Sequence, residues 1–87
     1  MKQVTFEGEA YRHFIEWALA DIKIFNRINE LIKDIDRTPF KGIGKPEPLK
    51  YQLKGCWSRR INDCHRLIYF ITASNQIHII SCKGHYS

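Results

Sequence analysis

The sequence predicts an α+β fold, in which an N-terminal strand and a two-helix hairpin pack on an antiparallel β-sheet. Two observations support this fold class: apolar residues recur at helical spacing over about the first 35 residues, and they alternate as in strands after about residue 50. The two regions are separated by a segment that holds all three prolines of the chain. Helices followed by a run of strands are typical of α+β folds. The 87 residues and the 44% hydrophobic content fit one small globular domain spanning residues 1–87.

The first third of the chain predicts a short strand followed by two helices. Residues 2–6 alternate in polarity, with Val4 and Phe6 apolar. From about residue 7 to residue 20, apolar residues at three- and four-residue spacing predict a helix. That apolar stripe consists of Ala10, Phe14, Trp17 and Ala18, together with Tyr11 and Ile15. Asp21 is the expected N-cap of a second helix, whose apolar face would serve as core or as a dimer surface, and the short connection favours an antiparallel hairpin.

The rest of the chain predicts a loop and then a meander of strands. Residues 38–48 contain all three prolines and two of the five glycines, so we expect a loop that is neither helix nor regular strand. Strand-like runs follow at residues 57–61, 66–71 and 76–82, and residues 51–53 are a candidate for a further short strand. Because side chains alternate along a strand, Arg59 and Arg60 should point to opposite faces, and one of the two must avoid the core or lie at its rim.

Positive charge is concentrated in the middle of the chain. The formal net charge is +5, and residues 36–66 alone contain eight Lys or Arg against three acidic side chains. A basic patch of this kind points to a polyanionic partner, with nucleic acid as the leading candidate. The alternative is a basic surface that has no specific partner.

Several other functional classes are disfavoured by the composition. The three cysteines are odd in number and lack C-x-x-C spacing, which argues against a disulfide framework and a zinc site and fits a reducing cytoplasm. The four histidines are too scattered to indicate metal ligation. No apolar run approaches the ~20 residues of a membrane span, and the N-terminus has no signal-peptide pattern. We therefore expect a cytoplasmic protein with no metal, no cofactor and no membrane association.

One carboxylate stands apart within the basic region. Glu47 is the only acidic residue between Thr38 and Asn62, and it lies between Pro46 and Pro48. The prolines restrict the backbone on both sides, which would hold the carboxylate in a fixed place. A rigidly held carboxylate among cations indicates an acid/base group that faces an anionic substrate, whereas the alternative is an ordinary solvated turn.

A series of motifs runs in one register along the whole chain. They are Ile28-Asn29-Glu30-Leu31-Ile32-Lys33-Asp34, Arg37-Thr38-Pro39-Phe40, Gly42, Gly44-Lys45-Pro46-Glu47-Pro48-Leu49-Lys50, Gly55, Trp57-Ser58-Arg59-Arg60-Ile61, His65-Arg66-Leu67 and His85-Tyr86. Taken together, these motifs resemble the YoeB/Txe toxins of the RelE superfamily. The resemblance implies a RelE-like fold similar to microbial RNases, and a type II toxin–antitoxin system in which a YefM-like antitoxin inhibits the toxin. It also implies an endoribonuclease that needs the ribosome but no metal and cuts mRNA in the ribosomal A site.

The resemblance further implies roles for individual residues. Glu47 would be the general base, Arg66 would stabilise the phosphate, and His85 would be the general acid, with Tyr86 beside it near the substrate. The expected substrate-binding cations are Lys50, Arg60, Arg59 and Lys45. The chain departs from the family pattern at two positions, since Ser87 follows the usual end of the chain and Cys64 stands where a polar or acidic residue is expected. Neither departure removes a group of the implied site.

The chemistry of RNA explains why one base, one acid and several cations would suffice. The ribose 2′-OH is an internal nucleophile, so cleavage needs a base for that hydroxyl, cations for the phosphate and an acid for the 5′ leaving oxygen. Glu47 would be ionised at neutral pH, whereas His85 would become a competent acid mainly when a bound phosphate favours the imidazolium. The Arg66 guanidinium could bond two phosphate oxygens, and Tyr86 could stack on an unpaired base.

Partners and alternatives complete the expectations. The resemblance implies mRNA on the ribosome as substrate, a YefM-like antitoxin as protein partner and operator DNA as an indirect partner through the antitoxin complex. It leaves open whether the chain is a monomer or a homodimer. The rival interpretation is a degenerate toxin that binds ribosome, RNA or antitoxin without catalysis, and a third is cleavage of free RNA. The structural alternatives for single residues are a frayed terminal His85, a turn-bonding His65, core Trp17 and Trp57, and a solvated or ribosome-facing Arg59.

Overall fold

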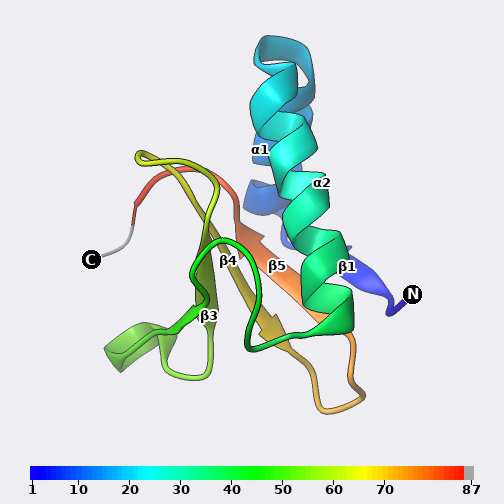
Figure 1. Cartoon of the computed structure of the whole chain (residues 1–87), viewed down its shortest axis with the longest axis vertical. Helices are drawn as coiled ribbons and strands as arrows, with labels where there is room; N and C mark the ends of the chain where they lie inside the picture. Colours follow the sequence, from blue (N-terminus) through cyan, green and yellow to red (C-terminus); the bar gives the residue numbers. More distant parts are fainter. Residues whose placement is uncertain (86–87) are drawn as a thin grey trace.

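The computed structural model describes residues 1–85 and has the predicted α+β architecture (Figure 1). The elements follow in the order β1 (Val4–Phe6), α1 (Gly8–Ala20), α2 (Ile22–Arg37), β2 (Glu47–Pro48), a 3₁₀ turn (Tyr51–Leu53), β3 (Trp57–Arg60), β4 (Arg66–Ile71) and β5 (Ile77–Ser81). The two helices form an antiparallel pair to one side of the sheet (Figure 1). Within residues 1–85, neither helix combines the length and hydrophobicity that a bilayer span requires.

Asp21 joins the two helices and confirms the predicted cap. Its backbone N–H donates to the carbonyl oxygen of Trp17 at 2.9 Å, which closes the last turn of α1. Its carboxylate accepts hydrogen bonds from the backbone N–H groups of Lys23 and Ile24 at 3.1 and 3.3 Å, which satisfies two free donors at the start of α2. An aspartate cap of this kind stabilises a helix by about 1 kcal/mol relative to alanine.

The core lies between α2 and the sheet, and α1 packs against α2, β5 and β1. Ile28, Leu31 and Ile35 on α2 are completely buried, and the sheet side of the core is formed by Leu67, Tyr69, Ile77 and Ile79. From α1, Ala10 is buried within the same cluster. Trp17 and Trp57 pack against its margin, as expected for core tryptophans.

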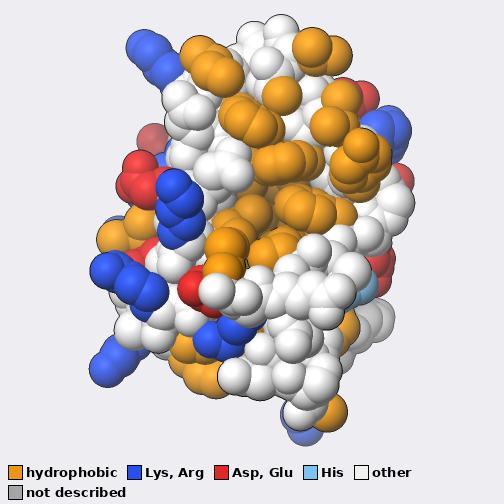
Figure 2. Space-filling model, turned by 90° about the vertical axis from the view of Figure 1, so that its right-hand side faces the viewer, with side chains coloured by type: hydrophobic (Ala, Val, Ile, Leu, Met, Phe, Trp, Pro, Cys, Tyr) orange, Lys and Arg blue, Asp and Glu red, His pale blue; other side chains and the backbone are white. Residues whose placement is uncertain are grey.

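Two residues of the predicted α1 stripe lie outside the core. Tyr11 is 57% exposed and Ile15 is 40% exposed, and the row continues to the exposed side chains of Leu19 and Ile22. Helical spacing correctly places Tyr11 and Ile15 on α1, but the apolar stripe is wider than the surface that α2 and the sheet cover. Hydrophobic side chains also gather in a broad band over the face shown in Figure 2, which is the right-hand side of Figure 1.

The sheet is mixed rather than wholly antiparallel. Its five strands lie in the order β1-β5-β4-β3-β2, and β3, β4 and β5 form the predicted antiparallel meander. β1, however, pairs parallel to β5, with Val4 opposite Ile77 and Phe6 opposite Ile79. The helical hairpin carries the chain away from β1, so this pairing joins residues more than 70 positions apart, which local periodicity does not encode.

Two local predictions between residues 47 and 53 were wrong. Glu47 and Pro48 form a two-residue edge strand that pairs with Ser58 and Trp57 of β3, although we expected a loop without regular strand. A proline is compatible with an edge strand because an edge strand has a neighbour on one side only, so an N–H that would point to the other side is not needed for the sheet. Residues 51–53 form a 3₁₀ turn instead of a strand, and Tyr51 adopts a left-handed backbone with φ of 58°.

Candidate functional site

Segments far apart in the sequence line one cleft of about 850 Å³. The pairing register explains why, since Glu47 lies opposite Ser58 and Arg60 lies opposite Arg66. Residues opposite one another in antiparallel strands share a face, so these side chains are on the sheet face away from the helices. The 3₁₀ turn and the C-terminal segment complete the walls. The cleft is lined by Lys45, Glu47, Pro48, Leu49, Lys50, Tyr51, Gln52, Leu53, Ser58, Arg60, Arg66 and His85.

Six of the eight predicted site residues therefore meet in the cleft. They are Lys45, Glu47, Lys50, Arg60, Arg66 and His85. Tyr86 lies outside the described residues. Arg59 does not line the cleft and is completely buried on the opposite face of the sheet.

The cations of the cleft have no acidic partner within residues 1–85. None of the ion pairs among these residues involves Lys45, Lys50, Arg60 or Arg66. Arg60 and Arg66 lie directly opposite one another on β3 and β4. Like charges in this position repel each other, so an anion bound between them would relieve an unfavourable contact. The cleft is consequently suited to a phosphate.

Arg66 is held in place by its own turn. Its side chain lies at the surface of the cleft with only 9% of the residue exposed. Its Nη1 donates to the carbonyl oxygens of Asn62 at 2.6 Å and His65 at 3.2 Å. These two bonds fix the orientation of the guanidinium of Arg66, which is one of the residues that line the cleft.

The segment around Glu47 is fixed by backbone contacts on both sides. The Arg60 N–H donates to the carbonyl oxygen of Gly44 at 2.7 Å, and the Leu49 N–H donates to that of Cys56 at 2.9 Å. Lys45 lies in the left-handed region with φ of 51°, a strained conformation for a residue with a side chain. The carboxylate of Glu47 is exposed and makes no ion pair within residues 1–85. Glu47 thus presents a free carboxylate from a constrained backbone.

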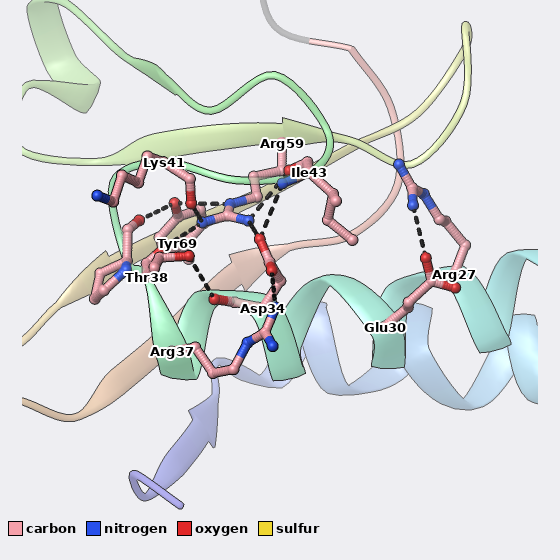
Figure 3. Close-up of polar contacts among 10 residues, drawn as sticks. Arg27, Glu30, Asp34, Arg37, Thr38, Lys41, Ile43, Arg59 and Tyr69 are labelled. Carbon is pink, nitrogen blue, oxygen red and sulfur yellow. Dashed lines mark hydrogen bonds and ion pairs between the residues drawn. The ribbon is translucent and has the colours of Figure 1, made fainter.

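Arg59 corrects a sequence-based prediction. It was expected to bind substrate, or to be a solvated or ribosome-facing charge, but strand alternation turns it toward α2, where it is 0% exposed. A buried guanidinium requires partners for all its donors, and this one makes five hydrogen bonds. Figure 3 shows these contacts. The acceptors are Asp34 Oδ2 at 2.5 Å, Thr38 O at 2.6 Å, Lys41 O at 2.9 Å, Ile43 O at 3.1 Å and Tyr69 Oη at 3.2 Å.

Asp34 is the acidic partner that sequence reasoning missed. Besides Arg59, its carboxylate accepts from the Ile43 N–H at 2.9 Å and from Arg37 at 3.0 Å (Figure 3). Burial alone would raise the pKa of Asp34, but the hydrogen bonds from Ile43, Arg59 and Arg37 outweigh it and lower the pKa to about 2. A signal was present, since Asp34 lies between buried Leu31 and Ile35 on α2, where an unpaired acid would be unfavourable. Asp34 and Arg59 together tie the loop that leads to Glu47 onto α2.

The C-terminal segment reaches the cleft under several restraints. Trp17 Nε1 donates to the carbonyl oxygen of Cys82 at 2.9 Å. Gly84 donates its N–H to His65 Nδ1 at 3.0 Å, and its carbonyl oxygen accepts from the Arg66 N–H at 2.8 Å. The predicted turn interaction of His65 is made by its backbone N–H, which donates to Asn62 Oδ1 at 2.8 Å. Its imidazole has a different partner, Gly84, so the segment just before His85 is anchored.

Neither a reactive buried thiol nor a metal centre is found among the described residues. Burial raises the pKa of the Cys82 thiol to about 12, so it is protonated and unreactive at neutral pH. In the part of the chain that the structure describes, no group of three His, Cys, Asp or Glu side chains is arranged to hold a metal ion. Within residues 1–85, the cleft offers one carboxylate, one imidazole and four cations. This combination can bind a phosphodiester and move protons on either side of it.

Comparisons with known proteins agree with the fold and with the motifs. Residues 6–86 match the family of YoeB-like toxins of bacterial type II toxin–antitoxin systems. Toxin YoeB of Streptomyces coelicolor is 50% identical over 97% of this chain and 99% of its own length. Among solved structures, the YoeB–YefM complex from Staphylococcus aureus has a TM-score of 0.91 at 45% identity, covering 99% of both chains. The YoeB dimer from the same species has a TM-score of 0.90 at 46% identity, covering 98% of both chains.

The family match spans nearly the whole chain, and identities near one half are far above the level at which only the fold is shared. Several of the motifs that suggested the resemblance also contribute residues to the cleft, namely those at residues 44–50, 57–61 and 65–67 together with His85. The chain therefore belongs to the YoeB-like family and is a toxin of a bacterial type II toxin–antitoxin system.

Proposed function

We propose that this toxin is a ribosome-dependent endoribonuclease that cuts mRNA in the ribosomal A site and so inhibits translation. The observation that carries the proposal is the shared cleft, in which Glu47, Arg66 and His85 come together from three separate segments. Each belongs to a different chemical class, and the three classes are those that cleavage of RNA by its own 2′-OH requires. The four cations around them, which have no acidic partner within the described part of the chain, supply a positive electrostatic environment for the phosphate.

The proposed reaction is an internal transfer at phosphorus. Glu47 takes the proton from the 2′-OH, and the 2′-oxygen forms a bond to the phosphorus as the bond to the 5′-oxygen breaks. His85, in its imidazolium form, donates a proton to the departing 5′-oxygen. The products are a 2′,3′-cyclic phosphate and a free 5′-hydroxyl end. Because the nucleophile belongs to the substrate, no metal-bound water is needed.

The cations act on the charge that builds up on the phosphate. Arg66 offers its free donors to the non-bridging oxygens, where charge grows in the transition state. Its bonds to the Asn62 and His65 carbonyl oxygens fix the guanidinium before substrate arrives, which avoids a loss of side-chain entropy on binding. Lys50, Arg60 and Lys45 would neutralise the phosphates on either side, and Tyr86 would lie near the substrate.

Cleavage of a defined mRNA on purified ribosomes tests the mechanism. Glu47→Gln and His85→Gln are each expected to lower the cleavage rate constant by about 10²- to 10⁴-fold, the usual effect of removing one acid/base group. Glu30→Gln is the matched control, because Glu30 is an exposed acid on α2 whose one ion-pair partner within residues 1–85 is Arg27. If both cleft variants cut mRNA at the wild-type rate, the toxin acts by binding without catalysis. Cleavage of the same mRNA without ribosomes would contradict ribosome dependence.

We further propose a YefM-like antitoxin as the cytoplasmic partner, with operator DNA bound through the toxin–antitoxin complex and a homodimer as a second assembly. The support is the relatives described as a YoeB–YefM complex and as a YoeB dimer. The exposed apolar row of Tyr11, Ile15 and Leu19 on α1 offers surface for a protein partner. Induced expression should arrest growth, and co-expression of a YefM-like protein should restore it. If growth arrest persists although the YefM-like protein co-purifies with the toxin, the proposal that the antitoxin neutralises the toxin is contradicted.

A further inference from the structure

The segment before His85 is held by two opposed hydrogen bonds at one residue. Gly84 donates its N–H to the imidazole Nδ1 of His65 at 3.0 Å and accepts at its carbonyl oxygen from the Arg66 N–H at 2.8 Å. Its φ of 92° lies in the left-handed region, where a residue other than glycine would be strained. Gly84 is therefore fixed in orientation as well as in position.

The His65 ring is itself held in place by its surroundings. It packs edge-on against the indole of Trp17, with ring centroids 4.9 Å apart and planes at 68°. The Trp17 Nε1 in turn donates to the carbonyl oxygen of Cys82, two residues before Gly84. The His65 backbone N–H is bonded to Asn62 Oδ1 at 2.8 Å. A ring that packs on Trp17 and grows from a hydrogen-bonded backbone can act as a rigid acceptor for the Gly84 N–H.

We propose that His65 is a positioning residue for His85: its Nδ1 holds the Gly84 N–H and thereby sets where the imidazole of His85 enters the cleft. The inference rests on the proposed function, because it gives His85 the role of the acid. His85 is exposed and follows Gly84 directly, so its backbone position is set by the two bonds at Gly84. His65 does not touch the substrate in this proposal.

The same arrangement couples the proposed acid to the phosphate-binding arginine. The carbonyl oxygen of His65 accepts from Arg66 Nη1 at 3.2 Å, while the Arg66 N–H bonds to Gly84. One dipeptide, His65-Arg66, thus orients the guanidinium and the terminal segment at once. Proton donation to a leaving oxygen depends on placement, and an error of ~1 Å can lower the rate about 10²-fold.

Two substitutions at position 65 distinguish the contribution of the Nδ1 acceptor from that of the aromatic ring. His65→Phe keeps an aromatic ring against Trp17 but removes the acceptor, whereas His65→Asn removes the ring but places an amide oxygen where Nδ1 lies. We expect His65→Phe to lower the rate constant for mRNA cleavage on ribosomes about 10- to 100-fold. His65→Asn should retain most of the activity. Amide hydrogen exchange at Gly84 should accelerate in His65→Phe and stay slow in His65→Asn.

A double-mutant cycle with His85→Gln tests whether His65 acts through His85. If it does, adding His65→Phe to His85→Gln should change the rate by less than about twofold, because the group being positioned is already gone. Thermal unfolding and binding of a YefM-like protein check that each variant is folded. Multiplicative effects in the cycle, or a folded His65→Phe that cleaves at the wild-type rate while His85→Gln is slow, would overturn the positioning role alone. A His85→Gln variant as active as wild type would overturn the proposed function together with this inference.

Discussion

Two adjacent arginines show that the burial and the role of a residue depend on the face of the sheet to which its side chain points. Arg59 and Arg60 are neighbours on β3, yet the first is 0% exposed beneath the loop and the second is exposed in the cleft. An isolated buried charge would be strongly destabilising, but Arg59 meets the Asp34 carboxylate and four further acceptors. Arg60 has no acidic partner within residues 1–85 and remains free for a phosphate.

The lowered pKa of Asp34 makes a prediction about stability at acid pH. Its pKa is about 2 in the folded chain, against an ordinary value of 3.8. A depressed folded-state pKa means that the stabilisation is complete above pH ~4 and is lost as pH falls toward 2, which amounts to about 2 kcal/mol. Urea unfolding followed by tryptophan fluorescence at several pH values between 5 and 2 would measure the loss.

Asp34→Asn provides the comparison for that experiment. The variant should lack this part of the acid dependence, and it should be less stable than wild type by about 3–5 kcal/mol at pH 7, because Arg59 is left buried without its counter-charge. Glu30→Gln, which alters an exposed pair on the same helix, should change stability by less than about 1 kcal/mol. An Asp34→Asn variant with the acid profile of wild type would show that another carboxylate is responsible.

At the scale of elements, the loop between α2 and β2 is folded by its contacts with the buried core rather than by its own sequence. The Arg59 side chain donates hydrogen bonds to three backbone carbonyl oxygens of this loop, those of Thr38, Lys41 and Ile43. Gly44 brings the loop against β3, where its carbonyl oxygen accepts from the Arg60 N–H. The position of Glu47 at the cleft edge follows from this attachment.

Gly44→Ala tests how far the loop depends on that close approach. A Cβ at position 44 would lie 2.8 Å from Leu31 Cδ2 and 3.2 Å from Arg59 Cβ, on a backbone with φ of 78°. We expect a loss of about 2–4 kcal/mol in unfolding free energy, combining left-handed strain with overpacking. Cleavage of mRNA should also slow, because Glu47 would shift with the loop.

Gly55→Ala is the matched control for the backbone alone. Its φ of 96° is also left-handed, but a Cβ there meets nothing within 4 Å. This variant should lose only about 1–2 kcal/mol, the strain of the left-handed conformation. Equal losses in chemical denaturation for the two variants would mean that the contact with Leu31 and Arg59 is unimportant for the loop.

At the scale of the whole molecule, the sequence predicts what is local or follows a period, and it leaves long-range pairing and burial of charge undetermined. The two helices, the cap at Asp21 and the meander follow from short-range patterns and are confirmed. The parallel pairing of β1 depends on a partner at the other end of the chain. The burial of Arg59 depends on Asp34, which is 25 residues away.

In the candidate site, too, some residues can be predicted from the sequence and others cannot. Glu47 and the surrounding cations are visible in the sequence because their charge pattern is unusual, and the motif order points to Arg66 and His85. The hydrogen bond that the Gly84 N–H donates to the His65 imidazole joins residues 19 positions apart, and no spacing rule predicts it. Supporting residues of this kind become visible only when the fold brings their partners together.

The charge distribution of the molecule leads to a last prediction, on salt dependence. The net charge of +5 arises mainly from residues 36–66, and four of these cations line the cleft without acidic partners within residues 1–85. Each cation that neutralises a phosphate releases counterions. The logarithm of the affinity for single-stranded RNA should therefore fall by about 0.7 for each tenfold rise in salt concentration and for each phosphate contact. A Glu47→Gln background permits binding to be measured by fluorescence anisotropy with the RNA intact.

In that background, Lys50→Gln should weaken binding and reduce the slope of log Kd against log salt by about 0.7, because one phosphate contact is lost. Lys33→Gln removes the same charge from the exposed surface of α2, outside the cleft, and should leave the slope almost unchanged. The comparison holds net charge constant between the two variants, so any difference reports the location of the charge. Identical slopes for both would mean that RNA is attracted by the overall charge of the protein, and that the cleft is not where the phosphates bind.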